Sequence, residues 1–434
     1  MNLLNDRWLS TDKGLLSVTE ALRVAGAPMW GRGDWDAATR VLLVAALQTA
    51  IAQQPRLCPD ESTWQKFRHS PPPKLDDWFA PLVPAFDDGA FEMPVDKDAD
   101  RVNVSVLLPE APSANTTTKN ADIAMWRTSV RTSLPENEAR IALYSDALWG
   151  TRWGRGHRQG VRGESRMLTL VEADGDNSLW ESVWLNVLPA NRWERLFGKS
   201  TGNPFPWTQK LRKTVSPQNS NSLEVYWAMP RRLRLVNEAG NVVGLLRQPN
   251  GIDYQGWKHP LTPYRVAATK EVVAVRIAPG HIGYGDWVGI ATLGGPPGST
   301  PAMVVSEFIQ RRWEGGSLRL RACGWALVDA GSPGVFVEQT VPLMPTVDAE
   351  LVKGMLDAAI KRSRRLDDAL KRLHVNTLRD RLFAETEADW YERLRAREAG
   401  DWDKLLHRTA IRLFDKATDL RGNIGKVMQE RSRV

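Results

Sequence analysis

The four residues Pro342-Leu343-Met344-Pro345 separate two parts of the sequence that carry different patterns. Before them, strand patterns are mixed with helical ones and glycine is frequent. After them, glycine almost disappears until Gly400, and apolar residues fall on helical spacing. The sequence therefore predicts an α+β fold class: a large mixed α/β domain over 1–345, followed by a C-terminal helical bundle over 346–434.

Three apolar stripes support the bundle, and they begin near Leu351, Leu378 and Leu405. In the first part, helical spacing predicts buried helices over 36–52, 136–148 and 179–188. Asp34 or Asp36 is expected to cap the first of these helices, because a carboxylate accepts hydrogen bonds from the free N–H groups of a first turn.

Alternating apolar residues in the first part predict strands, because side chains of a strand point to opposite faces in turn. This pattern occurs over 102–106 and 223–227, and the apolar stretch 167–171 also predicts a strand. Turn residues between two strand patterns predict hairpins over 233–246 and over 325–337, the second with its tip at 329–334.

Composition limits the classes of protein to consider. The net charge of +7 and the pI of about 9.4 modestly favour a polyanionic partner. Two cysteines exclude a disulfide framework and a four-cysteine zinc site. The apolar run Val41–Ala46 is too short to cross a bilayer, and the N-terminus lacks a signal-peptide pattern. We expect a cytoplasmic protein with no membrane partner.

The stretch Arg152-Trp-Gly-Arg-Gly-His-Arg-Gln-Gly-Val-Arg-Gly163 carries four arginines, four glycines and no acidic residue. Glycine lets the backbone approach another surface closely, and arginine offers a planar charged fork to phosphates and base edges. The stretch predicts a loop that presses against nucleic acid. An arginine-rich surface loop with turn glycines remains the alternative at this point.

No motif in the sequence indicates catalysis. The six histidines show no metal-ligand spacing, and phosphate-loop, nucleophile-elbow and dinucleotide fingerprints are absent. We therefore expect no enzyme, no metal and no cofactor. One alternative is a stand-alone nucleic-acid-processing enzyme whose active site is assembled from distant carboxylates; another is a scaffold that binds only protein.

Several short stretches, in order along the chain, match landmarks of one family. They are Asn2–Trp8, Gly156–Gly163, Asn203–Trp207, Val225–Pro230, Gly256–Pro260 and Glu385–Glu387 with Trp390 and Tyr391. Through them the chain resembles the CasA-type large subunit of Cascade, the type I-E CRISPR surveillance complex.

The resemblance implies a non-catalytic subunit that recognises the protospacer-adjacent motif (PAM) in duplex DNA and starts strand separation, while base pairing reads the remaining sequence. Its implied partners are the 5′ handle of the guide RNA (crRNA), PAM-containing double-stranded DNA, and the backbone, small and 5′-handle-binding subunits of Cascade. A nuclease-helicase is recruited after R-loop formation.

The resemblance also implies which residues bind nucleic acid. The family's minor-groove loop maps to 152–157, where Gly154 and Gly156 are retained and Arg152 and Arg155 replace glycines. A hairpin tip that wedges beside the PAM maps to 328–334. The residues so assigned, with those of the glycine–arginine stretch, are Arg152, Gly154, Arg155, Gly156, His157, Arg158 and Arg162; Asn115, Lys119 and Asn120 for the RNA handle; Arg247, or its neighbour Gln248, for a minor-groove lysine; and Asp329, Ala330, Gly331 and Ser332 for the wedge.

Overall fold

A computed structural model gives the structure of the protein. It describes residues 1–24, 27–109, 131–150, 156–173, 179–267, 269–277, 282, 284–293, 298–312, 318–329 and 332–343. The helical bundle expected over 346–434 and the domain boundary expected at 345 lie outside the described residues.

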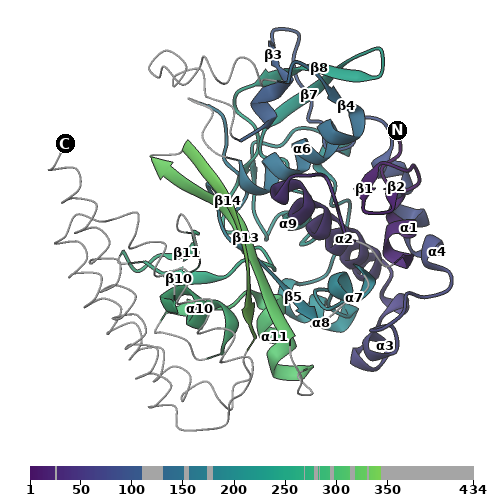
Figure 1. Cartoon of the computed structure of the whole chain (residues 1–434), viewed down its shortest axis with the longest axis vertical. Helices are drawn as coiled ribbons and strands as arrows, with labels where there is room; N and C mark the ends of the chain where they lie inside the picture. Colours follow the sequence, from purple (N-terminus) through teal and green to yellow (C-terminus); the bar gives the residue numbers. More distant parts are fainter. Residues whose placement is uncertain are drawn as a thin grey trace, which may run out of the picture.

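The centre of the described part is helix α2 (Gly33–Gln53), which lies among α6, α7 and α9 (Figure 1). Its residues from Val41 to Ile51 are all buried, as the apolar spacing predicts. The predicted cap is wrong, because no side chain caps the helix. Asp34 instead pairs with Arg32 at 3.2 Å, and a carboxylate oxygen of Asp36 accepts from the Trp30 amide at 2.8 Å. Within the described ranges, no helix is long and apolar enough to cross a membrane.

The predicted helices over 136–148 and 179–188 are confirmed as α6 and α7, although α7 ends at Trp184. Trp180 and Trp184 are buried, and their indoles donate to the carbonyls of Phe67 and Trp64. The helices besides α2 are α1 (Val18–Arg23), α3 (Glu61–Lys66), α4 (Leu75–Phe79), α6 (Glu136–Trp149), α7 (Leu179–Trp184), α8 (Ala190–Phe197), α9 (Glu224–Trp227), α10 (Tyr284–Ala291), α11 (Met303–Arg311), and the 3₁₀ turns η1 (Pro55–Leu57), η2 (Ala80–Phe86), η3 (Val104–Leu107) and η4 (Pro206–Thr208).

The strands form small sheets around this helical centre. One sheet has the order β3-β8-β4 with β7 also paired to β8, others have the orders β14-β13-β5 and β11-β10-β12, and β1-β2 and β6-β9 are pairs. Their bounds are β1 (Leu9–Thr11), β2 (Gly14–Leu16), β3 (Asp100–Asn103), β4 (Leu134–Pro135), β5 (Leu168–Ala173), β6 (Thr214–Val215), β7 (Arg232–Glu238), β8 (Asn241–Gln248), β9 (Asp253–Tyr254), β10 (Tyr264–Val266), β11 (Val272–Ala274), β12 (Ser299–Thr300), β13 (Leu318–Asp329) and β14 (Ser332–Pro342).

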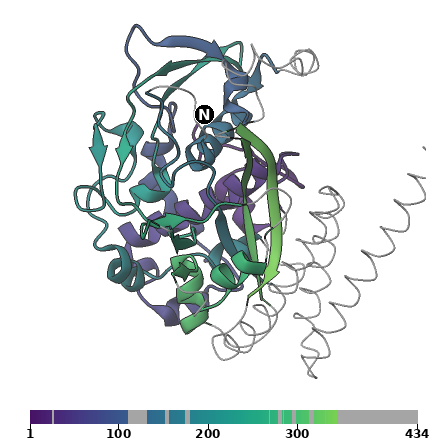
Figure 2. The ribbon, with the colours of Figure 1, turned by 90° about the vertical axis from the view of Figure 1, so that its left-hand side faces the viewer.

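Both predicted hairpins are present. Strands β7 and β8 meet at Ala239 and Gly240, whose φ angles of 50° and 81° form the tight turn. Strands β13 and β14 form a long hairpin along one side of the described part (Figure 2). Their pairing continues to Asp329 and Ser332, so the tip is tighter than the expected loop over 329–334.

Two predicted strands are wrong in part or entirely. Residues 224–227 form helix α9, whose side chains are all buried, so their alternation did not mark one buried face. Of residues 102–106, only the first two lie in β3; the chain then turns into η3, where the Asn103 side chain accepts from the Ser105 amide at 2.8 Å. An asparagine that bonds the backbone two residues ahead competes with strand pairing.

Candidate nucleic-acid interface

The predicted site residues fall into three groups in the structure. Gly156, His157, Arg158, Arg162 and Arg247 are described in full. Asp329 and Ser332 are described only by their backbone. The remaining ones lie outside the described residues: Arg152, Gly154, Arg155, Asn115, Lys119, Asn120, Ala330 and Gly331.

The described end of the glycine–arginine stretch, residues 156–163, is called here the Gly–Arg loop. Its first residue, Gly156, has a φ of 86°, and its carbonyl accepts from the Asn250 amide at 2.9 Å. A Cβ on Gly156 would lie 2.8 Å from Cβ of Pro249. Both observations require glycine there, because the loop begins in a left-handed turn packed against the end of β8.

A residue that sequence reasoning missed supports the middle of the loop. Nε of Arg231 donates to the Arg158 carbonyl at 2.7 Å, and its guanidinium also pairs with Asp146 of α6. Both members of this pair are buried, and burial raises the pKa of Asp146 and lowers the pKa of Arg231. Arg231 is distant from the loop in sequence, so no local pattern could have revealed this contact.

Arg162 does not lie where the sequence analysis placed it. Its side chain is buried, with 7% of the residue exposed, and the guanidinium donates to the carbonyls of Leu148, Arg166 and Met167. Burial lowers the pKa of Arg162 to about 10. The side chain therefore holds the loop to the interior, and its donors are directed at the protein rather than at a ligand.

Arg158 is the arginine that the loop presents at the surface. Its side chain is 45% exposed, and Nη1 lies 3.2 Å from Oδ1 of Asp253 in β9. A cavity of about 390 Å³ opens between the loop and residues Pro230 and Ile252–Tyr254. An exposed guanidinium beside an open cavity can bind a phosphate in a way that Arg162 cannot.

His157 and Arg247 lie together next to Arg158. The pKa of His157 is lowered, first by burial and then by the charges of Arg247 and Arg231, so the imidazole is neutral at neutral pH. Arg247 lies in β8, and its Nε is 4.0 Å from Asp100. The structure thus brings Gly156, His157, Arg158 and Arg247 to one region, with Arg158 and Arg247 as the cations.

The β13–β14 hairpin is joined to the same region through side chains. The ring of Phe336 packs edge-on against Trp149 at 5.4 Å, where α6 ends just before the glycine–arginine stretch. At the other end of the loop, Oγ of Ser165 donates to the Trp325 carbonyl at 2.5 Å. The loop and the hairpin are therefore held in a fixed relation by the folded core.

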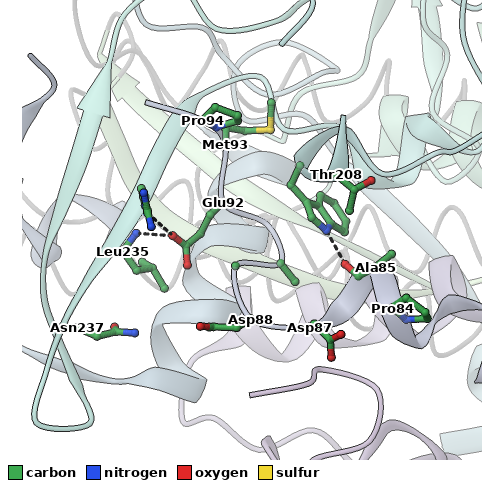
Figure 3. A pocket seen from close by; sticks show the side chains of 14 residues that line it. Pro84, Ala85, Asp87, Asp88, Glu92, Met93, Pro94, Thr208, Leu235 and Asn237 are labelled. Atoms are coloured by element: carbon green, nitrogen blue, oxygen red, sulfur yellow. Dashed lines mark hydrogen bonds and ion pairs between the residues drawn. The ribbon is translucent and has the colours of Figure 1, made fainter. Parts of the chain in front are cut away.

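A second cavity, of about 490 Å³, is lined by the carboxylates of Asp87, Asp88 and Glu92 (Figure 3). Their partners come from other parts of the chain. The guanidinium of Arg140, which is 1% exposed, lies 3.3 Å from Asp88 and 2.5 Å from Glu92. Glu92 also accepts from the Leu235 amide at 3.1 Å, and Asp87 accepts from Asn2 at 2.6 Å. These carboxylates come from one short stretch of the chain rather than from the distant stretches that the enzyme alternative requires, and each has a partner within the protein.

Among the described residues, no group of three or more His, Cys, Asp or Glu side chains is placed to hold a metal ion.

Comparisons with known proteins relate this geometry to a family. The model of the family described as CRISPR-associated protein Cse1 matches residues 2–420. Thermobifida fusca Cse1 is similar in structure with a TM-score of 0.72 at 17% identity, over 98% of this chain and 93% of that chain. Thermus thermophilus CasA (Cse1) gives a TM-score of 0.70 at 16% identity, over 97% and 94%.

A chain of a CRISPR RNA-guided surveillance complex is also similar, with a TM-score of 0.63 at 14% identity, over 95% of this chain and 89% of that chain. At these identities the likeness concerns the fold. No curated protein matches the sequence.

Proposed function

Because the chain belongs to the Cse1 family of CRISPR-associated proteins, we propose that it is the non-catalytic large subunit of a type I-E Cascade complex. It recognises the PAM in duplex DNA, starts strand separation and R-loop formation, and recruits the nuclease-helicase. Its other partners are the crRNA 5′ handle and the remaining Cascade subunits. Its structural similarity to a chain of a CRISPR RNA-guided surveillance complex supports this assignment.

The observation that carries the proposal is the construction of the Gly–Arg loop. Its backbone is held by Asn250 and Arg231, and Arg162 anchors it to the interior, while Arg158 stays exposed. A loop that is already ordered loses little conformational entropy when it binds, so more of the contact energy appears as affinity. Arginine responds to the negative potential of a narrow minor groove.

The roles of individual residues follow from this proposal. Arg152, Gly154 and Arg155 enter the minor groove next to Gly156, and Arg158 and Arg247 contact phosphates beside it. Neutral His157 adds no charge, and Arg162 is not a DNA contact. Two further groups complete the proposal: Asn115, Lys119 and Asn120 contact the RNA handle, and the hairpin tip from Asp329 to Ser332, with Ala330 and Gly331, is the wedge.

Replacement of Arg158 by alanine tests the proposal in the assembled complex loaded with guide RNA. We expect weaker binding of PAM-containing duplex and a salt dependence shallower by about 0.9, the contribution of one phosphate contact. The thermal stability should change little, since exposed ion pairs contribute about 0–1 kcal/mol. The measurement is the dissociation constant at several salt concentrations, with thermal unfolding in parallel.

Arg7→Ala is the matched control, because Arg7 is also an exposed arginine paired with one carboxylate, that of Glu20. It should leave duplex binding unchanged. Equal binding and equal salt dependence of the Arg158→Ala variant and the wild type would contradict the proposed role of the loop.

A further inference from the structure

A second basic segment borders the Gly–Arg loop. Between Glu194 and Glu224 the chain has no acidic residue, although it has five cationic ones. These are Arg195, Lys199, Lys210, Arg212 and Lys213. So long a stretch of one charge sign attracts a polyanion.

The cations of this segment differ in how they are compensated. Arg212 donates to the buried carboxylate of Glu224 at 2.6 Å, and Lys199 lies 3.9 Å from Glu194. Lys210 and Lys213 are exposed. Neither of these two lysines forms an ion pair with any residue that the structure describes. Their charges therefore remain available to a partner.

Strand pairing places one of these lysines beside the Gly–Arg loop. Strand β6 runs parallel to β9, and the Asp253 amide donates to the carbonyl of Lys213 at 2.9 Å. Asp253 is also the residue that pairs with Arg158. The basic segment thus continues the surface that Arg158 begins, on the side of the 390 Å³ cavity formed by β9.

The backbone of the segment is fixed before any partner binds. The Asn203 side chain donates to Oγ1 of Thr208 at 2.7 Å, and the Gln209 side chain donates to the Asn203 carbonyl at 2.8 Å. Beyond the lysines, Val215 is buried and its carbonyl accepts from the Trp257 indole at 3.1 Å. Binding therefore requires ordering of the lysine side chains alone.

We propose that Lys210 and Lys213 bind the phosphate backbone of duplex DNA next to the part held by the Gly–Arg loop. The inference rests on the proposed function of that loop. Lysine is a flexible point charge, which suits a phosphate but does not distinguish bases. The contact lengthens the DNA footprint and strengthens binding equally for every sequence.

The test uses the variant Lys210→Ala/Lys213→Ala in the assembled complex with guide RNA. Dissociation constants are measured against salt for a PAM-containing duplex and for a duplex of equal length without a PAM. We expect both constants to rise by the same factor and both salt dependences to become shallower by about 1.8, for two phosphate contacts. The ratio of the two constants should not change.

Lys66→Ala/Lys74→Ala is the matched control, because it removes two exposed lysines in or next to helices α3 and α4. It should leave both salt dependences as in the wild type. Thermal unfolding of each variant checks that the fold is intact.

Three outcomes would overturn the inference. One is an unchanged salt dependence while Arg158→Ala still weakens duplex binding, which leaves the proposed function of the loop intact. Another is a loss confined to the PAM-containing duplex, because the lysines would then read sequence. The third is a loss of binding to the guide RNA alone with duplex binding unaffected, which would assign the lysines to RNA.

Discussion

The cavity beside Arg140 and the cavity beside Arg158 both have arginine and carboxylate groups at their walls. They differ in whether the arginine charge is compensated inside the protein or is exposed to solvent. Arg140 is 1% exposed and lies among Asp88, Glu92 and Glu136. Arg158 is 45% exposed, and its Nη1 lies 3.2 Å from Oδ1 of Asp253, whose side chain is itself partly exposed. Both terminal nitrogens of Arg140 have carboxylate partners inside the protein, whereas Arg158 is open to solvent.

The difference indicates what each region contributes. Removing one partner of a buried ion pair leaves an uncompensated charge in a medium of low dielectric, so a buried network shows its effect in stability. An exposed ion pair contributes about 0–1 kcal/mol to stability. The charge of Arg158 is therefore expected to show its effect mainly when a polyanion binds.

The largest effect is expected from Arg140→Met. The variant keeps the bulk of the side chain but removes the buried cation of Glu92 and leaves it the exposed Arg234 at 3.9 Å, so the free energy of unfolding should fall by about 3–5 kcal/mol. The folded fraction should bind PAM-containing duplex as the wild type does. Urea denaturation and duplex titration measure the two quantities.

Arg234→Ala provides the comparison at the same cavity. Its side chain is 65% exposed and lies 3.9 Å from Glu92, so a loss of no more than about 1 kcal/mol is expected. If Arg140→Met costs no more than Arg234→Ala, the two cavities do not differ in the way described.

A smaller effect is expected at the tip of the β13–β14 hairpin. The body of this hairpin is tied to the fold, since Arg321 of β13 pairs with Glu172 of β5 and with Glu338 of β14. Deleting Asp329 and Ser332, the last paired residues, shortens the hairpin by one rung and leaves this body intact. Unstacking a base step costs a few kcal/mol, so binding of fully paired target should weaken by about 10- to 100-fold.

A target already mismatched beside the PAM needs no unstacking and should restore the affinity of this deletion variant. The deciding quantity is the ratio of affinities for paired and mismatched targets, compared between variant and wild type at one salt concentration. Equal losses on both targets would show that the hairpin tip does not act as a wedge.

The smallest effect concerns the pH dependence of stability. His259 is fully buried, and burial, followed by the charge of Arg162, lowers its pKa well below the ordinary value of 6.5. Below about pH 6.5 the unfolded chain takes up a proton that the folded chain does not. His259 should therefore remove about 1.4 kcal/mol of stability per pH unit as the pH falls from about 6.5.

His259→Gln lacks this titration, so its stability should fall less steeply than that of the wild type between pH 6.5 and 5.5. Identical slopes for wild type and His259→Gln, from urea denaturation at each pH, would show that His259 does not resist protonation in the folded state.

The sequence by itself determined the features that depend on local periodicity and on short ordered motifs. It predicted the buried helix at α2, the helices α6 and α7, both hairpins and the resemblance to the CasA-type family, which the family match confirms. Such patterns are readable because a side chain's position in a helix or strand follows from its spacing.

Only the tertiary structure decided what each arginine of one stretch does. Arg158 and Arg162 are four positions apart and have the same chemistry, yet one is exposed beside Asp253 and the other donates to three carbonyls inside. The same holds for residues 224–227, which alternate like a strand but form a helix buried on every side. Each of these residues also has a partner from a distant part of the chain, namely Asp253 for Arg158, Thr262 for Arg162 and Thr49 for Trp227. Burial depends on such tertiary contacts as well as on local spacing.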